Sequence, residues 1–282
     1  MLIDSRIEEI IDCALAEDLA LGDVTTGALI SGEQLGGGSI MVKEEGILAG
    51  VEVAKHVFQR LDPELKVDIL FEDGSKVKPG DVVARVEGKI ASILEVERLA
   101  LNFLQRLSGI ASETNRYVEA VKGLPVRITD TRKTTPGLRS LEKYAVRLGG
   151  GENHRMSLAD GILIKDNHLA ALGSQGLTFR EVIEKARQNT SIGQKIEVEA
   201  KTVSEAMEAA DAGVDIVMLD NMGLEDMRQA VRAIHGRVLV EASGGVTLDR
   251  VRAIAEIGVD FISVGALTHS AKALDISLEL ES

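Results

Sequence analysis

Residues 127–165 concentrate positive charge in a chain that is acidic overall. This window holds eight lysines and arginines against four acids, whereas the 282-residue chain carries a formal net charge of -13. The basic run 131–139 lies inside it, and His154 and Arg155 follow three glycines closely. Cations gathered in this way on an acidic protein are typical of a pocket for a small, highly charged anion. The acidic remainder argues against nucleic acid or anionic membrane as a partner. The alternative, a solvated charged helix, explains residues 140–147 but not the three glycines close to His154 and Arg155.

Single residues in and after this window leave alternatives open. Lys165 follows the apolar run 161–164, where a lysine serves as a Schiff-base nucleophile, as an anchor for a carboxylate, or as a surface residue with a buried stem. His154 either caps a helix or contacts the anion. Glycine backbone just before it allows a ligand to approach closely, which favours anion contact.

Carboxylates and glycines follow the later apolar runs. Glu197 and Glu199 alternate with apolar residues, so both face one side of a strand, and we expect that side to be a barrel interior with Glu199 nearer the mouth. Asp220 is either a site carboxylate or, with Asn221, a helix cap. Small residues and free N–H groups, as a phosphate requires, come in two turns: Ser243-Gly244-Gly245 and Val264-Gly265-Ala266.

The elements that must position these residues repeat at a near-constant spacing. We predict six strands, at residues 126–129, 161–164, 195–199, 214–219, 237–242 and 259–264. The last four recur every 20 to 22 residues, the length of one β/α unit. Helical periodicity fills the gaps at 203–212, 224–234 and 248–257, with Thr202 and Thr247 as N-caps. The pattern favours a (β/α) barrel or an open doubly wound sheet, in which the polar residues after the strands share one edge.

The first hundred residues follow a different pattern. We predict an amphipathic helix at 4–17, strands at 39–42, 66–71 and 82–86, and a long helix at 90–122. Residues 73–83 resemble the turn of a lipoyl or biotinyl carrier domain. They lack a carrier lysine flanked by methionines, so we interpret them as a structural hairpin.

Composition limits the class of protein. Aromatic residues make up 2% and tryptophan is absent, so the core must be aliphatic, as suits a parallel sheet covered by helices. Cys13 is the only cysteine, which excludes an internal disulfide framework and a multi-cysteine zinc site. The sequence has neither a signal-peptide pattern at its start nor an apolar run approaching eighteen residues. We therefore expect a cytoplasmic protein.

Seven motifs, taken in order, resemble the quinolinate phosphoribosyltransferases, also called nicotinate-nucleotide pyrophosphorylases (carboxylating). They span residues 17–26, 102–111, 130–139, 142–146, 149–155, 163–168 and 261–268. The resemblance covers nearly the whole chain. A related family associated with molybdenum utilisation usually departs at the Lys-Asp-Asn-His segment, which is intact at 165–168.

The resemblance implies an α/β fold with two domains and a shared site. An N-terminal α/β sandwich would span residues 1–108, with the C-terminal tail 270–282 returning to it. An incomplete (β/α) barrel would span 109–269. The family further implies a homodimer in which each active site borrows residues from the neighbouring subunit.

The implied reaction joins quinolinate to 5-phosphoribosyl 1-pyrophosphate (PRPP), and gives nicotinate mononucleotide, pyrophosphate and CO2 for NAD biosynthesis. Substrate would be bound by Arg106 of the partner subunit and by Thr131, Arg132, Lys133, His154, Arg155, Lys165, Glu199, Asp220, Ser243, Gly244, Gly245, Val264, Gly265 and Ala266. Glu199 and Asp220 would also serve Mg²⁺. The catalytic set would be Lys133, Lys165, Glu199 and Asp220. Two alternatives remain, a Lys165 Schiff-base aldolase and a non-catalytic carrier module.

Overall fold

The computed structural model describes residues 4–191, 193–234 and 236–281. The chain divides into two compact units. The first contains the chain up to Asn115, Thr134–Gly150 and the chain from Leu267 on, and the second contains Arg116–Lys133 and Gly151–Ala266. The 31-residue helix α4 (Ile90–Ala120) runs from the first unit into the second. Within the described ranges, no helix has the length and apolar character needed to cross a membrane.

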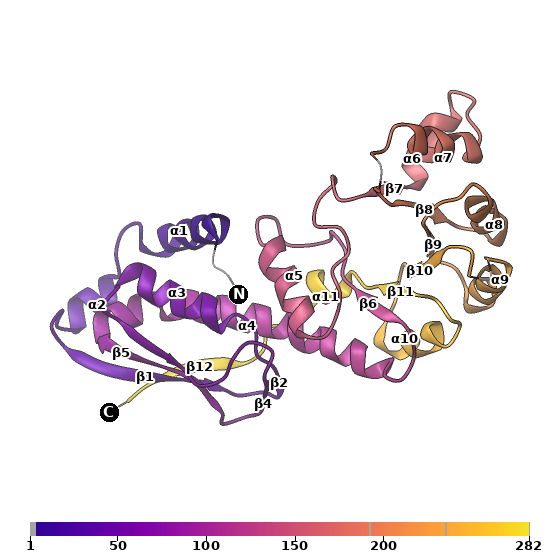
Figure 1. Ribbon diagram of the computed structural model, residues 1–282. Helices are drawn as coiled ribbons and strands as arrows, with labels where there is room; N and C mark the ends of the chain where they lie inside the picture. Colours follow the sequence, from indigo (N-terminus) through magenta and orange to yellow (C-terminus); the bar gives the residue numbers. More distant parts are fainter. Residues whose placement is uncertain (1–3, 192, 235, 282) are drawn as a thin grey trace. The chain divides into compact units, whose positions relative to one another are not determined.

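The first unit is built on an antiparallel sheet of four strands (Figure 1). Its order is β12 (Ile276–Leu280), β1 (Leu35–Val42), β5 (Val82–Lys89) and β3 (Lys66–Ile69). The short strands β2 (Gly46–Ile47) and β4 (Lys76–Val77) form a second, antiparallel pair. Besides α4, the unit contains α1 (Ser5–Leu19), α2 (Val24–Leu29), α3 (Val51–Leu61), α5 (Arg139–Leu148) and most of α11 (Ala266–His269). Pairing with β1 brings the last strand of the chain into the N-terminal sheet.

The second unit carries the predicted parallel sheet. Its strands, in spatial order, are β6 (Arg127–Thr129), β11 (Phe261–Ser263), β10 (Leu239–Ser243), β9 (Ile216–Asp220), β8 (Ile196–Ala200) and β7 (Ile162–Ile164). Every neighbouring pair in this order is parallel. Figure 1 shows α6 (Asp166–Gly173), α7 (Phe179–Gln188), α8 (Val203–Asp211), α9 (Leu224–Ile234) and α10 (Leu248–Ala255) along one side of the curved row. The predicted mixed α/β architecture with a barrel-like parallel sheet is confirmed.

Local sequence explains where most of these elements lie. All five positions of β8 are buried, and Val217, Leu219 and Ala242 of the adjoining strands are fully buried, so the sheet has the aliphatic interior that the composition predicts. The Thr202 side chain accepts from the Glu205 amide and starts α8. Thr247 occupies the corresponding position before α10 but makes no capping hydrogen bond. Both threonines therefore stand at the predicted N-cap positions, and Thr202 alone of the two makes the capping hydrogen bond.

Two further expectations need correction. Residues 73–83 contain β4, a turn at Pro79 and Gly80 (φ 91°) and the start of β5. The two strands do not pair as a hairpin, because β4 pairs with β2 and β5 pairs with β1 and β3. The helix at residues 140–147 is not a solvated charged helix either. Glu142 and Lys143 are both fully buried.

Candidate active site

The second unit contains a cavity of about 540 Å³ at the carboxyl ends of its parallel strands, where reactive groups gather in such folds. Most of the predicted site residues line it: Thr131, Arg132, Lys133, His154, Arg155, Lys165, Glu199, Asp220, Ser243, Gly244 and Gly245. They come from the ends of β6 to β10 and from the segment before β7. The structure thus brings together residues more than a hundred positions apart in the sequence.

One group of lining residues is cationic. Arg155 donates from Nη1 to the Gly161 carbonyl oxygen at 2.8 Å, and the Lys133 amide donates to the Thr131 hydroxyl at 3.0 Å. Burial, together with the neighbouring charge of Arg132, lowers the pKa of Arg155. Among the described residues, the buried Nε atoms of Arg132 and Arg155 have no hydrogen-bond partner. Guanidinium groups with unused donors fit an anionic ligand, most closely a carboxylate.

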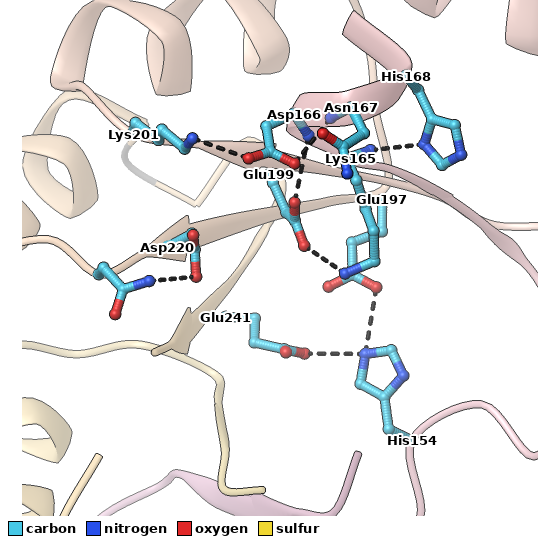
Figure 2. Close-up of polar contacts among 11 residues, drawn as sticks. His154, Lys165, Asp166, Asn167, His168, Glu197, Glu199, Lys201, Asp220 and Glu241 are labelled. Atoms are coloured by element: carbon cyan, nitrogen blue, oxygen red, sulfur yellow. Dashed lines mark hydrogen bonds and ion pairs between the residues drawn. The ribbon is translucent and has the colours of Figure 1, made fainter. Parts of the chain in front are cut away.

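Lys165 belongs to a chain of charged contacts at the ends of β7 and β8 (Figure 2). Its Nζ lies 2.7 Å from Oε1 of Glu199, which is nine-tenths buried. Oε2 of Glu199 accepts from the Asp166 amide at 3.4 Å, and the Lys165 amide donates to Nδ1 of His168 at 3.0 Å. In this contact Lys165 Nζ is the cationic partner of an ion pair. A Schiff-base nucleophile must be a neutral amine, so this contact argues against the aldolase interpretation.

Two buried carboxylates contact the imidazole ring of His154. Its Nε2 lies 3.2 Å from Glu197 and 3.4 Å from Glu241 (Figure 2), and Nδ1 lies 2.8 Å from the Arg155 amide nitrogen. Burial acts to lower the His154 pKa, but the bonds to Glu197 and Glu241 outweigh it and raise the pKa to about 10. Both ring nitrogens are thus engaged within the barrel. His154 lines the cavity mainly as an anchor for its neighbour Arg155.

The positions of Glu197 and Glu199 test the predicted direction of the β8 side chains. Glu197 and Glu199 are both buried on the inner face, as predicted. Burial, and the nearby charge of Glu241, raise the pKa of Glu197. The sequence interpretation missed Glu241, which lines the cavity. Its signal was present, because an acid interrupts the otherwise apolar run of β10 in the same way as Glu197 interrupts β8.

Asp220 supplies a second carboxylate to the cavity from the end of β9. Helix α9 begins four residues later, at Leu224, so the helix-cap alternative for Asp220 has no support. Asn221 Nδ2 donates to Asp220 Oδ1 at 3.0 Å. Glu199 and Asp220, on neighbouring strands, offer the hard oxygen donors that Mg²⁺ prefers.

Four predicted residues are not among those that line the cavity: Arg106, Val264, Gly265 and Ala266. The Val264 amide donates to the Thr129 carbonyl oxygen at 2.9 Å, so it has no N–H left for a phosphate. Arg106 belongs to the first unit. It donates from Nη2 to Glu142 at 2.8 Å, from Nη1 to the Ala271 carbonyl oxygen at 3.0 Å, and to the Thr268 carbonyl oxygen. These bonds commit Arg106 within its own chain.

Comparisons with known proteins cover nearly the whole chain. Residues 23–108 match the N-terminal domain and residues 110–279 the C-terminal domain of quinolinate phosphoribosyl transferase. A probable nicotinate-nucleotide pyrophosphorylase [carboxylating] from Bacillus subtilis is 43% identical over 98% of this chain and 93% of its own length. Its counterpart from Synechocystis is 44% identical over 94% of this chain and 90% of its own. The crystal structure of NadC from Streptococcus pyogenes has a TM-score of 0.94 at 43% identity, and covers 100% of this chain and 98% of that one.

Proposed function

Because this chain belongs to the quinolinate phosphoribosyltransferase family, we propose that it transfers the phosphoribosyl group of PRPP to quinolinate with loss of CO2. The products are nicotinate mononucleotide and pyrophosphate, which places the enzyme in the de novo synthesis of NAD. One observation carries the proposal for the site. A single cavity holds guanidinium groups with unused donors, in Arg132 and Arg155, together with two carboxylates, Glu199 and Asp220.

The cationic group suits quinolinate, a pyridine with adjacent carboxylates. Arg132 and Arg155 would pair with these carboxylates through parallel N–H bonds that fix the ring in plane. Lys165 would add a third cation, held in place by Glu199 at 2.7 Å. Thr131 and His154 support this group, since each binds the backbone amide of a neighbouring cationic residue. Lys133 is exposed at the cavity and would meet a phosphate.

The carboxylate group suits the sugar and the metal ion. Glu199 and Asp220 would accept hydrogen bonds from the ribose hydroxyls of PRPP and hold Mg²⁺ directly or through its waters. Mg²⁺, when bound with PRPP, supplies positive charge against the departing pyrophosphate. The turn at Ser243–Gly245 would hold the 5-phosphate through backbone N–H groups.

The chemistry follows from this placement. The ring nitrogen attacks the anomeric carbon, and the developing negative charge on the leaving group is met by Lys133 and the neighbouring cations. Once the nitrogen is quaternary, the bond to the 2-carboxylate breaks and CO2 leaves. The electron pair stays on the ring carbon, where the adjacent cationic nitrogen stabilises it, and a proton from water then completes nicotinate mononucleotide. We assign no residue as a base for decarboxylation.

We further propose that the enzyme works in the cytoplasm as a homodimer with shared active sites. The family resemblance supports the dimer, in which Arg106 of the partner subunit is the expected shared residue; within its own chain Arg106 already bonds Glu142 and the Ala271 carbonyl oxygen. Analytical ultracentrifugation tests the oligomeric state.

Turnover of purified protein tests the reaction itself. With quinolinate, PRPP and Mg²⁺, we expect nicotinate mononucleotide, CO2 and pyrophosphate in equal amounts. Nicotinate is the matched control substrate, because it lacks the 2-carboxylate. We expect kcat/KM for quinolinate to exceed that for nicotinate roughly a hundredfold, the effect of leaving charged hydrogen-bonding groups unpaired. Comparable values for both acids, or a carbonyl adduct of Lys165 trapped by borohydride, would refute the proposal.

A further inference from the structure

Asn221 joins the ends of two strands at the edge of the cavity. It follows Asp220 directly and is the one non-glycine residue with positive φ, 55°, in the part of the chain that the structure describes. Its backbone amide donates to the Ser243 carbonyl oxygen at 2.9 Å. Its side-chain Nδ2 donates to Asp220 Oδ1 at 3.0 Å. Asn221 therefore contacts the last residue of β9 and the last residue of β10 at once.

The Asn221 side chain also lies against Gly244. A Cβ atom built on Gly244 would stand 2.3 Å from Asn221 Oδ1 and 2.4 Å from Cγ, so the space that a side chain at 244 would need is filled by the amide. Gly244 has φ 90° and Gly245 has φ 56°, values that favour glycine. The shape of this turn is thus matched to the presence of the Asn221 side chain.

We propose that Asn221 is a positioning residue that holds Asp220 and the Ser243–Gly245 turn in one fixed arrangement, so that both bind PRPP together. This inference rests on the proposed function. The Asn221 amide uses Oδ1 of Asp220, which sets the rotamer of the carboxylate and leaves Oδ2 for a ribose hydroxyl or for Mg²⁺. Contact with Gly244 fixes the turn that would receive the 5-phosphate. The ribose and phosphate sites of one ligand therefore depend on one side chain.

Asparagine meets three requirements at this position that few residues meet together. It adopts left-handed backbone more readily than other non-glycine residues. Its Nδ2 is a neutral donor to Asp220, whereas an aspartate would place a second negative charge beside that carboxylate. Its planar amide packs flat against a glycine. Glycine at 221 would keep the backbone conformation and lose only the side-chain contacts, which makes it the most informative substitution.

The test compares Asn221→Gly and Asn221→Asp with wild type. We expect Asn221→Gly to raise KM for PRPP about tenfold and to leave KM for quinolinate within about twofold, because a misplaced Asp220 and a loosened turn affect PRPP alone. Calorimetry with PRPP and Mg²⁺, without quinolinate, should show the same loss of affinity. Asn221→Asp should weaken PRPP binding further. The melting temperature of Asn221→Gly should stay near that of wild type, because glycine suits φ 55°.

Asn189→Gly is the matched control, since Asn189 is an exposed residue at the C-terminal end of α7 that bonds only the Lys185 carbonyl oxygen with its side chain. Its kinetic constants should equal those of wild type. Unchanged PRPP affinity in Asn221→Gly would overturn the inference, and so would equal weakening of both substrates with a lowered melting temperature. An incorrect proposed function would give a different experimental result from an incorrect role for Asn221. Wild type would then make no nicotinate mononucleotide, while calorimetry would still report on PRPP binding by each variant.

Discussion

His154 illustrates how one residue of the cavity is fixed before any ligand arrives. Asp130, fully buried at the end of β6, accepts from the His154 backbone amide at 2.9 Å, while Glu197 and Glu241 hold the ring. These contacts reach β6, β8 and β10 from one short segment. Since Arg155 follows directly and donates its amide to the His154 ring, its guanidinium starts from a fixed backbone.

The raised pKa of His154 predicts a pH-dependent stability. The folded pKa is about 10 and the ordinary value is 6.5, so the folded state binds the proton more tightly. Its contribution to the free energy of unfolding is full below about pH 6.5, falls as the pH rises, and is lost above about pH 10. Urea unfolding of wild type and His154→Gln across this range should show a difference that shrinks with pH. A constant difference would mean a neutral ring throughout, with Nδ1 accepting from the Arg155 amide at every pH.

For single residues, the sequence predicted which residue types occur in the site better than it predicted which residues contact one another. The basic run and the acids after the strands were identifiable because charge in apolar surroundings is costly and therefore conspicuous. Asn221 and Glu241 were not assigned to the site. The role of Asn221 depends on its backbone conformation and on Gly244, and that of Glu241 depends on a histidine 87 positions earlier. Such non-local contacts leave no local pattern.

Among the elements, α4 and α5 are joined by a partly buried ion pair. Arg106 of α4 pairs with Glu142 of α5, which is fully buried and also accepts from the Thr135 amide and hydroxyl. The remaining Arg106 donors bind carbonyl oxygens of the segment that leads to β12. This arrangement favours a structural role for Arg106.

Arg106→Ala should therefore destabilise the protein and spare its ligand site. Removing Arg106 leaves the buried Glu142 without its ionic partner, although Thr135 still donates to it, at a cost of roughly 2 kcal/mol in the free energy of unfolding. Quinolinate affinity, measured where the variant is folded, should match wild type. Arg228→Ala removes an exposed pair with Glu225 and serves as the control, with an expected cost of about 0.5 kcal/mol or less. Normal stability combined with lost quinolinate binding would restore Arg106 as a substrate-binding residue.

Element positions were predictable where periodicity was regular. The near-constant spacing after residue 195 located β8 to β11 and their helices, because each β/α unit repeats the same length. Short elements such as the six-residue α2 carry too little pattern, and Thr247 had the right residue type without the hydrogen bond. The hairpin predicted at residues 73–83 does not form. Turn residues fix a turn, but the choice of strand partner is made by distant segments.

The whole molecule carries a net charge of -13, yet four cations, Arg132, Lys133, Arg155 and Lys165, line its cavity. The acidic exterior disfavours polyanions, while the cations act at short range on a ligand small enough to enter. The carboxylates Glu199 and Asp220 lie in the same cavity, so it has two chemically distinct parts. We propose that the cationic part binds quinolinate and that the carboxylates bind the sugar and the metal ion.

Calorimetry on Arg155→Ala and Asp220→Ala tests that division most directly. Each loses a charged hydrogen-bonding partner, worth about 1.5 to 3 kcal/mol, or roughly tenfold to a hundredfold in affinity. Arg155→Ala should lose quinolinate affinity and keep PRPP affinity. Asp220→Ala should lose PRPP affinity, with an altered Mg²⁺ dependence, and keep quinolinate affinity. If folded Asp220→Ala instead fails to bind quinolinate, the two parts are not separate, and Asp220 acts by orienting the basic residues.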